Sequence, residues 1–148
     1  MSKNILFFDD RYASLDTVTF LEDCNYCVYW AKEFLSANYY INFDPGIQSL
    51  ISMIVDLEIP YNEDDFSEKE KKDLNNYPVN VSGWIWIKKI LLNYDYKGKI
   101  LILSGHRLSI VSEDIKKYDD RVIYISKGSG RVLESIDRIL KTTVVAES

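Results

Sequence analysis

The chain has 148 residues, of which 47% are hydrophobic and 28% are charged, and its formal net charge at pH 7 is −5. This length suits one domain, and the hydrophobic content supports an ordinary core, which argues against intrinsic disorder. The acidic balance argues against direct nucleic-acid binding, and the sequence contains neither an apolar run of membrane-spanning length nor a signal peptide, so we expect a cytoplasmic protein with no membrane partner.

Short apolar runs of the strand type alternate with helical patterns through the first part of the chain. Leu15, Val18 and Leu21 recur on one helical face, whereas the flanking runs are continuously apolar, as in strands buried on both faces of a sheet. Residues 32–43 fit a helix less well, because tyrosines and asparagine weaken the pattern. The predicted elements are a strand at 4–8, a helix at 12–23, a strand at 26–31, this weaker helix, a break at 44–46 and a strand at 50–56.

The second part opens with a polar, charged segment at 61–80. Ser67 and Glu70 have the spacing of a capping box for one short helix, but the segment has too few apolar residues to add much to a core, so we expect it to lie on the surface. Trp84 and Trp86 lie in an amphipathic helix that starts at about residue 82, and because they are two apart only one is expected to face the core well. The remaining predicted elements are a strand at 97–105, a helix at 109–118, a strand at 121–127, a final helix from residue 132 and a tail at 142–148.

This order of elements predicts an α/β fold. Strands that are apolar on both faces and alternate with helices form a parallel sheet covered on two sides, with right-handed crossovers. We therefore expect a single domain over 1–148 with a flavodoxin-like, doubly wound five-stranded parallel sheet in the order 2-1-3-4-5 and helices on both faces. The charged segment 61–80 would be an insertion between the third strand and the helix that follows it.

Polar side chains stand at the carboxyl ends of four predicted strands. Asp9 and Asp10 follow the first strand, Asp56 ends the third, Ser104 ends the fourth and Lys127 ends the fifth. Ligands of open parallel sheets bind beyond these strand ends, so we expect the five side chains to converge. Clustered carboxylates need a cation, and oxygen ligands suit Mg²⁺. A carboxylate can also attack phosphorus, and the hydroxyl and ammonium groups would stabilise the oxygens of the product.

With these five residues in this order, the sequence resembles the response-regulator receiver domains of two-component signalling over about residues 3–141. Three more residues fit the pattern of the family. Pro60 completes the family's D-x-x-x-P after the third strand, Gly83 opens the following helix, and Tyr124 lies where the family often has a switch aromatic. Each match is weak by itself, and the resemblance depends on all of them occurring in order on the right elements.

The resemblance implies a phosphorylation-dependent signalling switch. Asp56 would accept a phosphoryl group from a histidine kinase or phosphotransfer protein, assisted by Ser104 and Lys127. The only reactions expected are self-phosphorylation from a phospho-donor and autodephosphorylation, with no turnover of a small molecule. By resemblance, the ligands of Mg²⁺ would be Asp9, Asp10, Asp56 and the backbone carbonyl of Glu58.

The resemblance also implies how the signal would leave the domain. Ser104 would swing toward the phosphoryl group, and Tyr124 would follow inward. This movement would reshape the face made by the helix at 109–118, the strand at 121–127 and the final helix. That face would then dock a downstream protein target or a second copy of the chain as a homodimer.

Two departures from the family pattern keep a second function open. Gly128 follows Lys127 where the family usually has a proline in a cis peptide, and the segment between Pro60 and Gly83 is much longer than in the family. Both departures favour a pseudo-receiver, which acts as a protein-interaction module without phosphate. The complete set of five polar residues favours phosphorylation.

Overall fold

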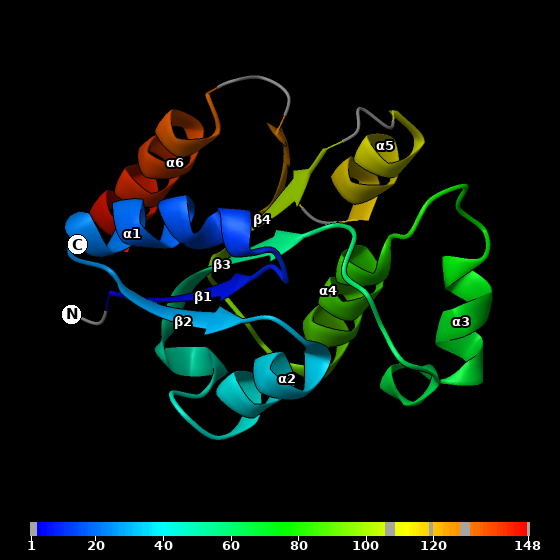
Figure 1. Cartoon of the computed structure of the whole chain (residues 1–148). Coiled ribbons are helices and arrows are strands. Elements are labelled where there is room, and N and C mark those ends of the chain that lie inside the picture. Colours follow the sequence, from blue (N-terminus) through cyan, green and yellow to red (C-terminus); the bar gives the residue numbers. More distant parts are fainter. Residues whose placement is uncertain (1–2, 106–108, 119, 128–130, 148) are drawn as a thin grey trace.

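The computed structural model describes residues 3–105, 109–118, 120–127 and 131–147, which form a five-stranded sheet between two layers of helices (Figure 1). The strands pair in the order β2-β1-β3-β4-β5, and every pair is parallel. The strands are β1 (Asn4–Phe8), β2 (Cys27–Ala31), β3 (Leu50–Asp56), β4 (Lys99–Ser104) and β5 (Val122–Ser126). The predicted flavodoxin-like fold and its strand order are confirmed.

The two faces of the sheet are covered by different helices (Figure 1). Successive strand residues point to opposite faces, so Phe7 packs into the core beneath one helical layer and Phe8 into the core beneath the other. The helices are α1 (Leu15–Asp23) and α6 (Val132–Glu147) on the Phe7 face, and α2 (Phe34–Asn42), α4 (Ser82–Asn93) and α5 (Ser109–Tyr118) on the Phe8 face.

The weaker predicted helix forms as α2. Its buried residues are Phe34, Ala37 and Ile41, which repeat at helical spacing and outweigh the poor helix propensity of the tyrosines. The break that follows is confirmed as well, because Gly46 has a φ of 85°, in the left-handed region that glycine adopts at little cost. At the other end of the chain, α6 continues through residues 142–147, which we expected to form a tail.

The segment 61–80, called the insertion below, contains one turn of 3₁₀-helix (Glu63–Asp65) and the helix α3 (Glu68–Leu74). The predicted capping box is present, since Ser67 and Glu70 each accept a hydrogen bond from the other's backbone N–H. The insertion contributes more to the core than we expected. Phe66 is buried with its ring centroid 5.0 Å from that of Phe34 in α2, and Leu74 joins the same core.

Both tryptophans of α4 are buried, so the expectation that only one would face the core is wrong. Trp86 packs edge-on against Phe8, at 5.2 Å between ring centroids, and its Nε1 donates to Asn38 Oδ1 of α2 at 2.8 Å. Trp84 turns the other way and meets Tyr118 of α5, at 5.4 Å between centroids. Because α4 lies between α2 on one side and α5 on the other, its buried arc is wider than that of an ordinary surface helix.

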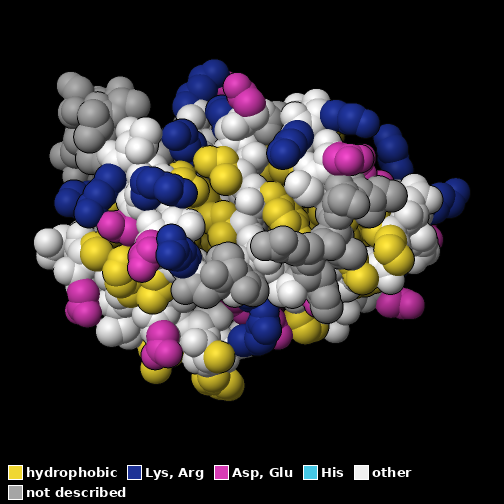
Figure 2. All heavy atoms as spheres, turned by 90° about the horizontal axis from the view of Figure 1, so that it is seen from above, with side chains coloured by type: hydrophobic (Ala, Val, Ile, Leu, Met, Phe, Trp, Pro, Cys, Tyr) yellow, Lys and Arg dark blue, Asp and Glu magenta, His cyan; other side chains and the backbone are white. Residues whose placement is uncertain are grey.

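The surface of the described residues is mixed in charge. On the face seen in Figure 2, lysine and arginine side chains are interspersed with acidic ones and do not merge into one basic field. In the ranges that the structure describes, no helix combines the length and the apolar character needed to cross a membrane.

Candidate functional site

The five predicted polar residues meet at the carboxyl edge of the sheet. Asp9 directly follows β1, Asp56 is the last residue of β3, Ser104 is the last residue of β4, and Lys127 directly follows β5. Asp9 and Asp56 are 0% and 2% exposed, and Asp10 is half-buried. One carboxylate oxygen from each of these three residues lies within 4.8 Å of the others. We call Asp9, Asp10 and Asp56 the carboxylate cluster.

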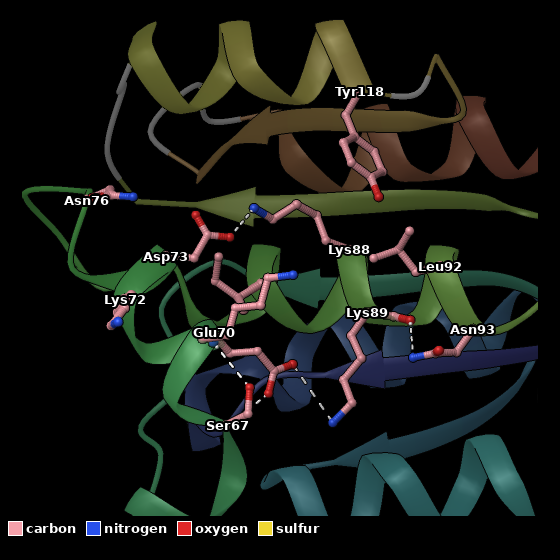
Figure 3. A pocket seen from close by; sticks show the side chains of 12 residues that line it. Ser67, Glu70, Lys72, Asp73, Asn76, Lys88, Lys89, Leu92, Asn93 and Tyr118 are labelled. Carbon is pink, nitrogen blue, oxygen red and sulfur yellow. Dashed lines mark hydrogen bonds and ion pairs between the residues drawn. The ribbon is translucent and has the colours of Figure 1, made fainter.

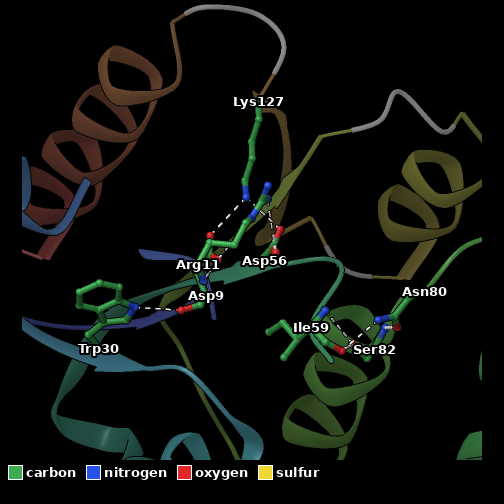
Figure 4. Close-up of polar contacts among 8 residues, drawn as sticks. All are labelled: Asp9, Arg11, Trp30, Asp56, Ile59, Asn80, Ser82 and Lys127. Carbon is green, nitrogen blue, oxygen red and sulfur yellow. Dashed lines mark hydrogen bonds and ion pairs between the residues drawn. The ribbon is translucent and has the colours of Figure 1, made fainter. Parts of the chain in front are cut away.

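Lys127 provides one cation to this cluster (Figure 4). Its Nζ lies 3.2 Å from Asp9 Oδ2 and 3.2 Å from Asp56 Oδ1, so one ammonium bridges the ends of the two adjacent strands β1 and β3. The partly exposed side chain reaches the two buried carboxylates from above the sheet edge. This arrangement offsets part of the repulsion between two negative charges in a buried place.

Arg11 provides a second cation, which was not among the site residues predicted from the sequence. Its backbone N–H donates to Asp9 Oδ1 at 3.0 Å, and its guanidinium lies 3.8 Å from the same oxygen and 3.7 Å from Asp56 Oδ2. The side chain is 53% exposed, so it approaches the cluster from solvent. A small hollow of about 230 Å³ opens beside it, lined also by Ser14, Lys127 and other residues of this edge.

The two oxygens of Asp56 are in unlike positions. Oδ1 faces Lys127, whereas Oδ2 is buried and has no hydrogen-bond partner within the part of the chain that is described. Burial, and secondarily the charge of Asp9, raise the pKa of Asp56 to about 6, while Lys127 and Arg11 act in the opposite direction. The carboxylate is therefore more basic than an ordinary aspartate, and among the described residues Oδ2 has an ion pair with Arg11 at 3.7 Å but no hydrogen bond.

The donor set of the cluster suits a hard divalent cation. Three carboxylates offer oxygen atoms at close range, and the buried Asp56 Oδ2 accepts no hydrogen bond from the described residues and has the Arg11 guanidinium 3.7 Å away as its counter-charge. Glu58, whose backbone carbonyl was expected to be a fourth ligand, lies two residues past Asp56 and is half-buried. The three carboxylates could hold such an ion.

Gly83 allows α4 to lie directly against the end of β3. A Cβ atom at this position would lie 2.0 Å from the backbone oxygen of Asp56 and 3.2 Å from Leu57 Cα. The backbone is also joined here, because Gly83 N–H donates to Leu57 O at 3.0 Å. Only glycine fits this contact, which gives a steric reason for the glycine that the resemblance predicted.

The loop after Asp56 is fastened to the start of α4 by side-chain hydrogen bonds (Figure 4). Ser82 Oγ donates to Ile59 O at 2.6 Å and accepts from Ile59 N–H at 3.0 Å. Asn80 Nδ2 donates to the same carbonyl at 2.9 Å, and Asn80 Oδ1 accepts from Ser82 N–H. The chain that leaves the site before the insertion is thus tied to the chain that returns after it.

Ser104 and Tyr124 lie where the resemblance expects the switch residues. Ser104 is fully buried and pairs with Ser126 in the β4–β5 register, one position beyond the pairing of Asp56 with Leu103. Tyr124 is half-buried and packs against the core on the α5 side of the sheet. Gly105, which directly follows Ser104, is exposed, and no atom lies within 4 Å of a Cβ built at this position. Gly128, the family's proline position, lies outside the described residues.

Comparison with known proteins gives the fold a name. No protein-family model matches the sequence, and no curated protein sequence matches it. Among solved structures, a response-regulator receiver domain from Methanospirillum hungatei JF-1 matches with a TM-score of 0.60 at 20% identity over 99% of both chains. A receiver domain from Methylobacillus flagellatus matches with a TM-score of 0.64 at 16% identity, over 97% of this chain and 99% of that one. The chain has the receiver fold.

A third structure with the receiver fold was solved in a chemically informative state. It is a response regulator from Burkholderia pseudomallei with a phosphorylated aspartic acid, a calcium ion and citrate, and it matches with a TM-score of 0.60 at 22% identity, over 99% of this chain and 72% of that one. The structural similarity to these proteins, at 16–22% sequence identity, shows the receiver fold and no more than the fold.

Proposed function

We propose that this chain is a phosphorylation-dependent signalling switch in which Asp56 accepts a phosphoryl group from a histidine kinase or phosphotransfer protein. The observation that carries the proposal is the asymmetry of the Asp56 carboxylate. One oxygen is held 3.2 Å from Lys127 and the other is buried without a hydrogen bond, beside two further carboxylates. A structural aspartate at this depth would normally use both oxygens as acceptors.

In the proposed reaction, the Asp56 carboxylate attacks the phosphorus of a phosphohistidine. A P–O bond forms, the P–N bond breaks, and its electron pair stays on the imidazole nitrogen, which takes up a proton from solvent. Lys127 and Arg11, within 3.2 and 3.7 Å of the carboxylate oxygens, stabilise the negative charge on the transferred group. With a pKa of about 6, Asp56 is largely ionised at neutral pH and is a better nucleophile than an ordinary aspartate.

Mg²⁺ is the proposed cofactor. Asp9, Asp10, Asp56 and the backbone carbonyl of Glu58 would hold it, and it would supply positive charge to the phosphoryl oxygens. The fit rests on the three carboxylates, whose oxygens lie within 4.8 Å of one another, and on Asp56 Oδ2, which is buried without a hydrogen bond from the described residues.

Output is proposed to run through Ser104 and Tyr124. The Ser104 hydroxyl would bond a phosphoryl oxygen, and Tyr124 would move further into the core that it already touches. The face made by α5, β5 and α6 would change shape and dock a downstream protein target or a second copy of the chain. Such a domain would act in a phosphorelay without turning over a small molecule.

One observation favours a second candidate, a pseudo-receiver that binds partners without phosphate. The insertion is folded, contributes buried side chains to the core and lies next to the loop that leaves Asp56. A segment ordered in this way is suited to hold a constant interaction surface, whatever the state of Asp56.

The two candidates are separated by phosphate retention. The protein would be incubated with Mg²⁺ and acetyl phosphate and then examined by phosphate-affinity electrophoresis and intact mass. We expect one hydroxylamine-labile phosphate in the wild type and in Asp16→Asn, a control on the exposed face of α1, and none in Asp56→Asn. Equal behaviour of the wild type and Asp56→Asn would contradict the switch and leave the interaction module.

A further inference from the structure

A second concave site lies between the insertion and α4, away from the carboxylate cluster (Figure 3). It is a hollow of about 680 Å³ with α3 on one side, α4 along its floor and Tyr118 of α5 at one end. We call it the α3–α4 groove. Its lining residues are Ser67, Lys69, Glu70, Lys72, Asp73, Asn76, Ile85, Lys88, Lys89, Leu92, Asn93 and Tyr118.

The α3–α4 groove offers apolar surface to solvent. Leu92 is 77% exposed although it lies on a helix that is otherwise largely buried, and Tyr118 is 42% exposed. Ile85 lies one helical turn from Lys88 and Lys89, whose aliphatic stems continue the floor. Unlike a single exposed leucine on a convex surface, this apolar surface is set in a concave, preformed site.

The charge of the α3–α4 groove is opposite to that of the whole chain. Four lysines line it, against the two acids Glu70 and Asp73. Both acids already have a cation: Asp73 is paired with Lys88, and Glu70 lies 3.9 Å from Lys89. Lys69 and Lys72 are exposed, and neither has an ion-pair partner in the described part of the chain. A surplus of two positive charges thus borders the apolar floor, in a chain whose net charge is −5.

The walls of the α3–α4 groove are held in place by contacts at both ends of the insertion. The capping box fixes the start of α3, and the Lys88–Asp73 pair ties α3 to α4. At the far end, Tyr77 Oη donates to Asp114 Oδ2 of α5 at 2.9 Å. Burial, together with this bond, raises the pKa of Tyr77 to about 12, so its hydroxyl stays protonated and keeps donating. A groove formed in advance loses little entropy on binding.

We propose that the α3–α4 groove docks an acidic, amphipathic segment of a partner protein. Apolar side chains of the segment cover Leu92 and Tyr118, and its carboxylates meet Lys69 and Lys72. This is the helix-in-groove mode of peptide recognition, with charge complementarity that selects acidic partners. A nucleic acid fits less well, because it needs a longer row of cations than two surplus lysines and gains little from an apolar floor. The interaction does not depend on phosphorylation of Asp56.

The test uses the full-length, unphosphorylated protein and two synthetic amphipathic helices of equal length. One has leucine on its apolar face and glutamate on its polar face, and the other has lysine in place of glutamate. Binding is followed by ¹⁵N–¹H chemical shifts and fluorescence anisotropy. We expect the acidic peptide alone to bind, with shift changes in α3, in the second half of α4 and at Tyr118.

Two variants with the same change of net charge decide whether binding is at the groove. Lys69→Glu with Lys72→Glu should weaken binding by about tenfold or more, whereas Lys97→Glu with Lys141→Glu, at exposed positions elsewhere, should leave it near the wild type. Leu92→Asp should also abolish binding without loss of stability, because Leu92 is exposed.

The proposal would be overturned by absence of binding, by equal binding of the basic peptide, by equal loss in both double variants, by shift changes confined to another face, or by displacement with a short single-stranded oligonucleotide. Failure of Asp56 to retain phosphate would leave every one of these readouts unchanged, so the two proposals can fail separately.

Discussion

The contact of Gly83 with the end of β3 can be tested by adding a single methyl group. In Gly83→Ala, the new Cβ would lie 2.0 Å from the Asp56 backbone oxygen and 3.0 Å from its carbonyl carbon. Neither atom belongs to a side chain that can rotate away. Because Asp56 is the last residue of a strand with neighbours on both sides, α4 has to move outward, and this movement opens the packing of Trp84 and Trp86.

Two opposing effects set the expected magnitude. Alanine is favoured over glycine within a helix by about 1 kcal/mol, and by less near the first turn, where Gly83 lies. Overpacking costs about 1–3 kcal/mol, and the upper end applies when the obstacle is backbone. We therefore expect Gly83→Ala to lower the free energy of unfolding by about 2 kcal/mol.

Urea denaturation followed by tryptophan fluorescence measures this change, because two of the tryptophans lie on the helix that must move. Gly105→Ala is the matched control at the same edge of the sheet, since nothing lies within 4 Å of a Cβ built there. We expect the control to stay within about 0.5 kcal/mol of the wild type. Equal stability of Gly83→Ala and the wild type would contradict the close approach of α4 to the backbone of Asp56.

Three further predictions concern pH, the second cation and the insertion. In metal-free buffer, Asp56→Asn should gain stability relative to the wild type by about 2 kcal/mol between pH 4 and pH 7, because the pKa of Asp56 is raised from 3.8 in the unfolded chain to about 6 in the folded protein, so the wild type loses stability as the pH rises through this range. Urea denaturation at each pH measures the difference between the two proteins, and a difference that does not vary with pH would contradict the raised pKa. Arg11→Ala should bind Mg²⁺ a few-fold more tightly than the wild type, because the substitution removes a half-exposed cation 3.7 Å from Asp56 Oδ2, while Arg11→Lys should remain closer to the wild type. The fluorescence of Trp30, whose indole Nε1–H donates to the Asp9 carbonyl, reports the Mg²⁺ titration. An unchanged or weaker affinity would contradict competition between the Arg11 guanidinium and Mg²⁺ for the carboxylate cluster. Phe66→Ala should lower the free energy of unfolding by about 3 kcal/mol, because it removes a buried ring, whereas Phe43→Ala, at an exposed aromatic, should lower it by less than about 1 kcal/mol. Urea denaturation measures both changes, and equal losses of stability would show that the insertion does not belong to the core.

Much of the fold could be predicted from the sequence because the buried strands consist almost entirely of apolar residues. Residues 50–55 are apolar except for Ser52, a pattern typical of a strand buried on both faces of a parallel sheet, and β3 is central. The positions of Asp9, Asp56 and Lys127 at strand ends then followed from the rule that carboxyl ends of parallel strands share one edge.

The errors came from tertiary partners that local patterns do not encode. Phe66 lies in a charged stretch, and what brings it into the core is its contact with the ring of Phe34, far away in sequence. Only one of Trp84 and Trp86 was expected to face the core, but Trp84 is also buried, because it packs against Tyr118 of α5. Arg11 directly follows the acidic pair, yet nothing in its spacing predicts that the side chain folds back onto Asp56.

The hydrogen bonds between Ile59, Asn80 and Ser82 have a consequence for how this protein can diversify. They close the base of the insertion like a stem, so the residues above the stem form a loop whose ends are already together. The entropy of closing a flexible loop rises by only about 0.6 kcal/mol for each doubling of its length. Lengthening an exposed part of the loop that leaves Phe66 and Leu74 in the core is therefore cheap, whereas altering the stem or Gly83 is not. The loop next to Asp56 is therefore a site where evolution or protein engineering can insert new recognition segments without changing the sheet.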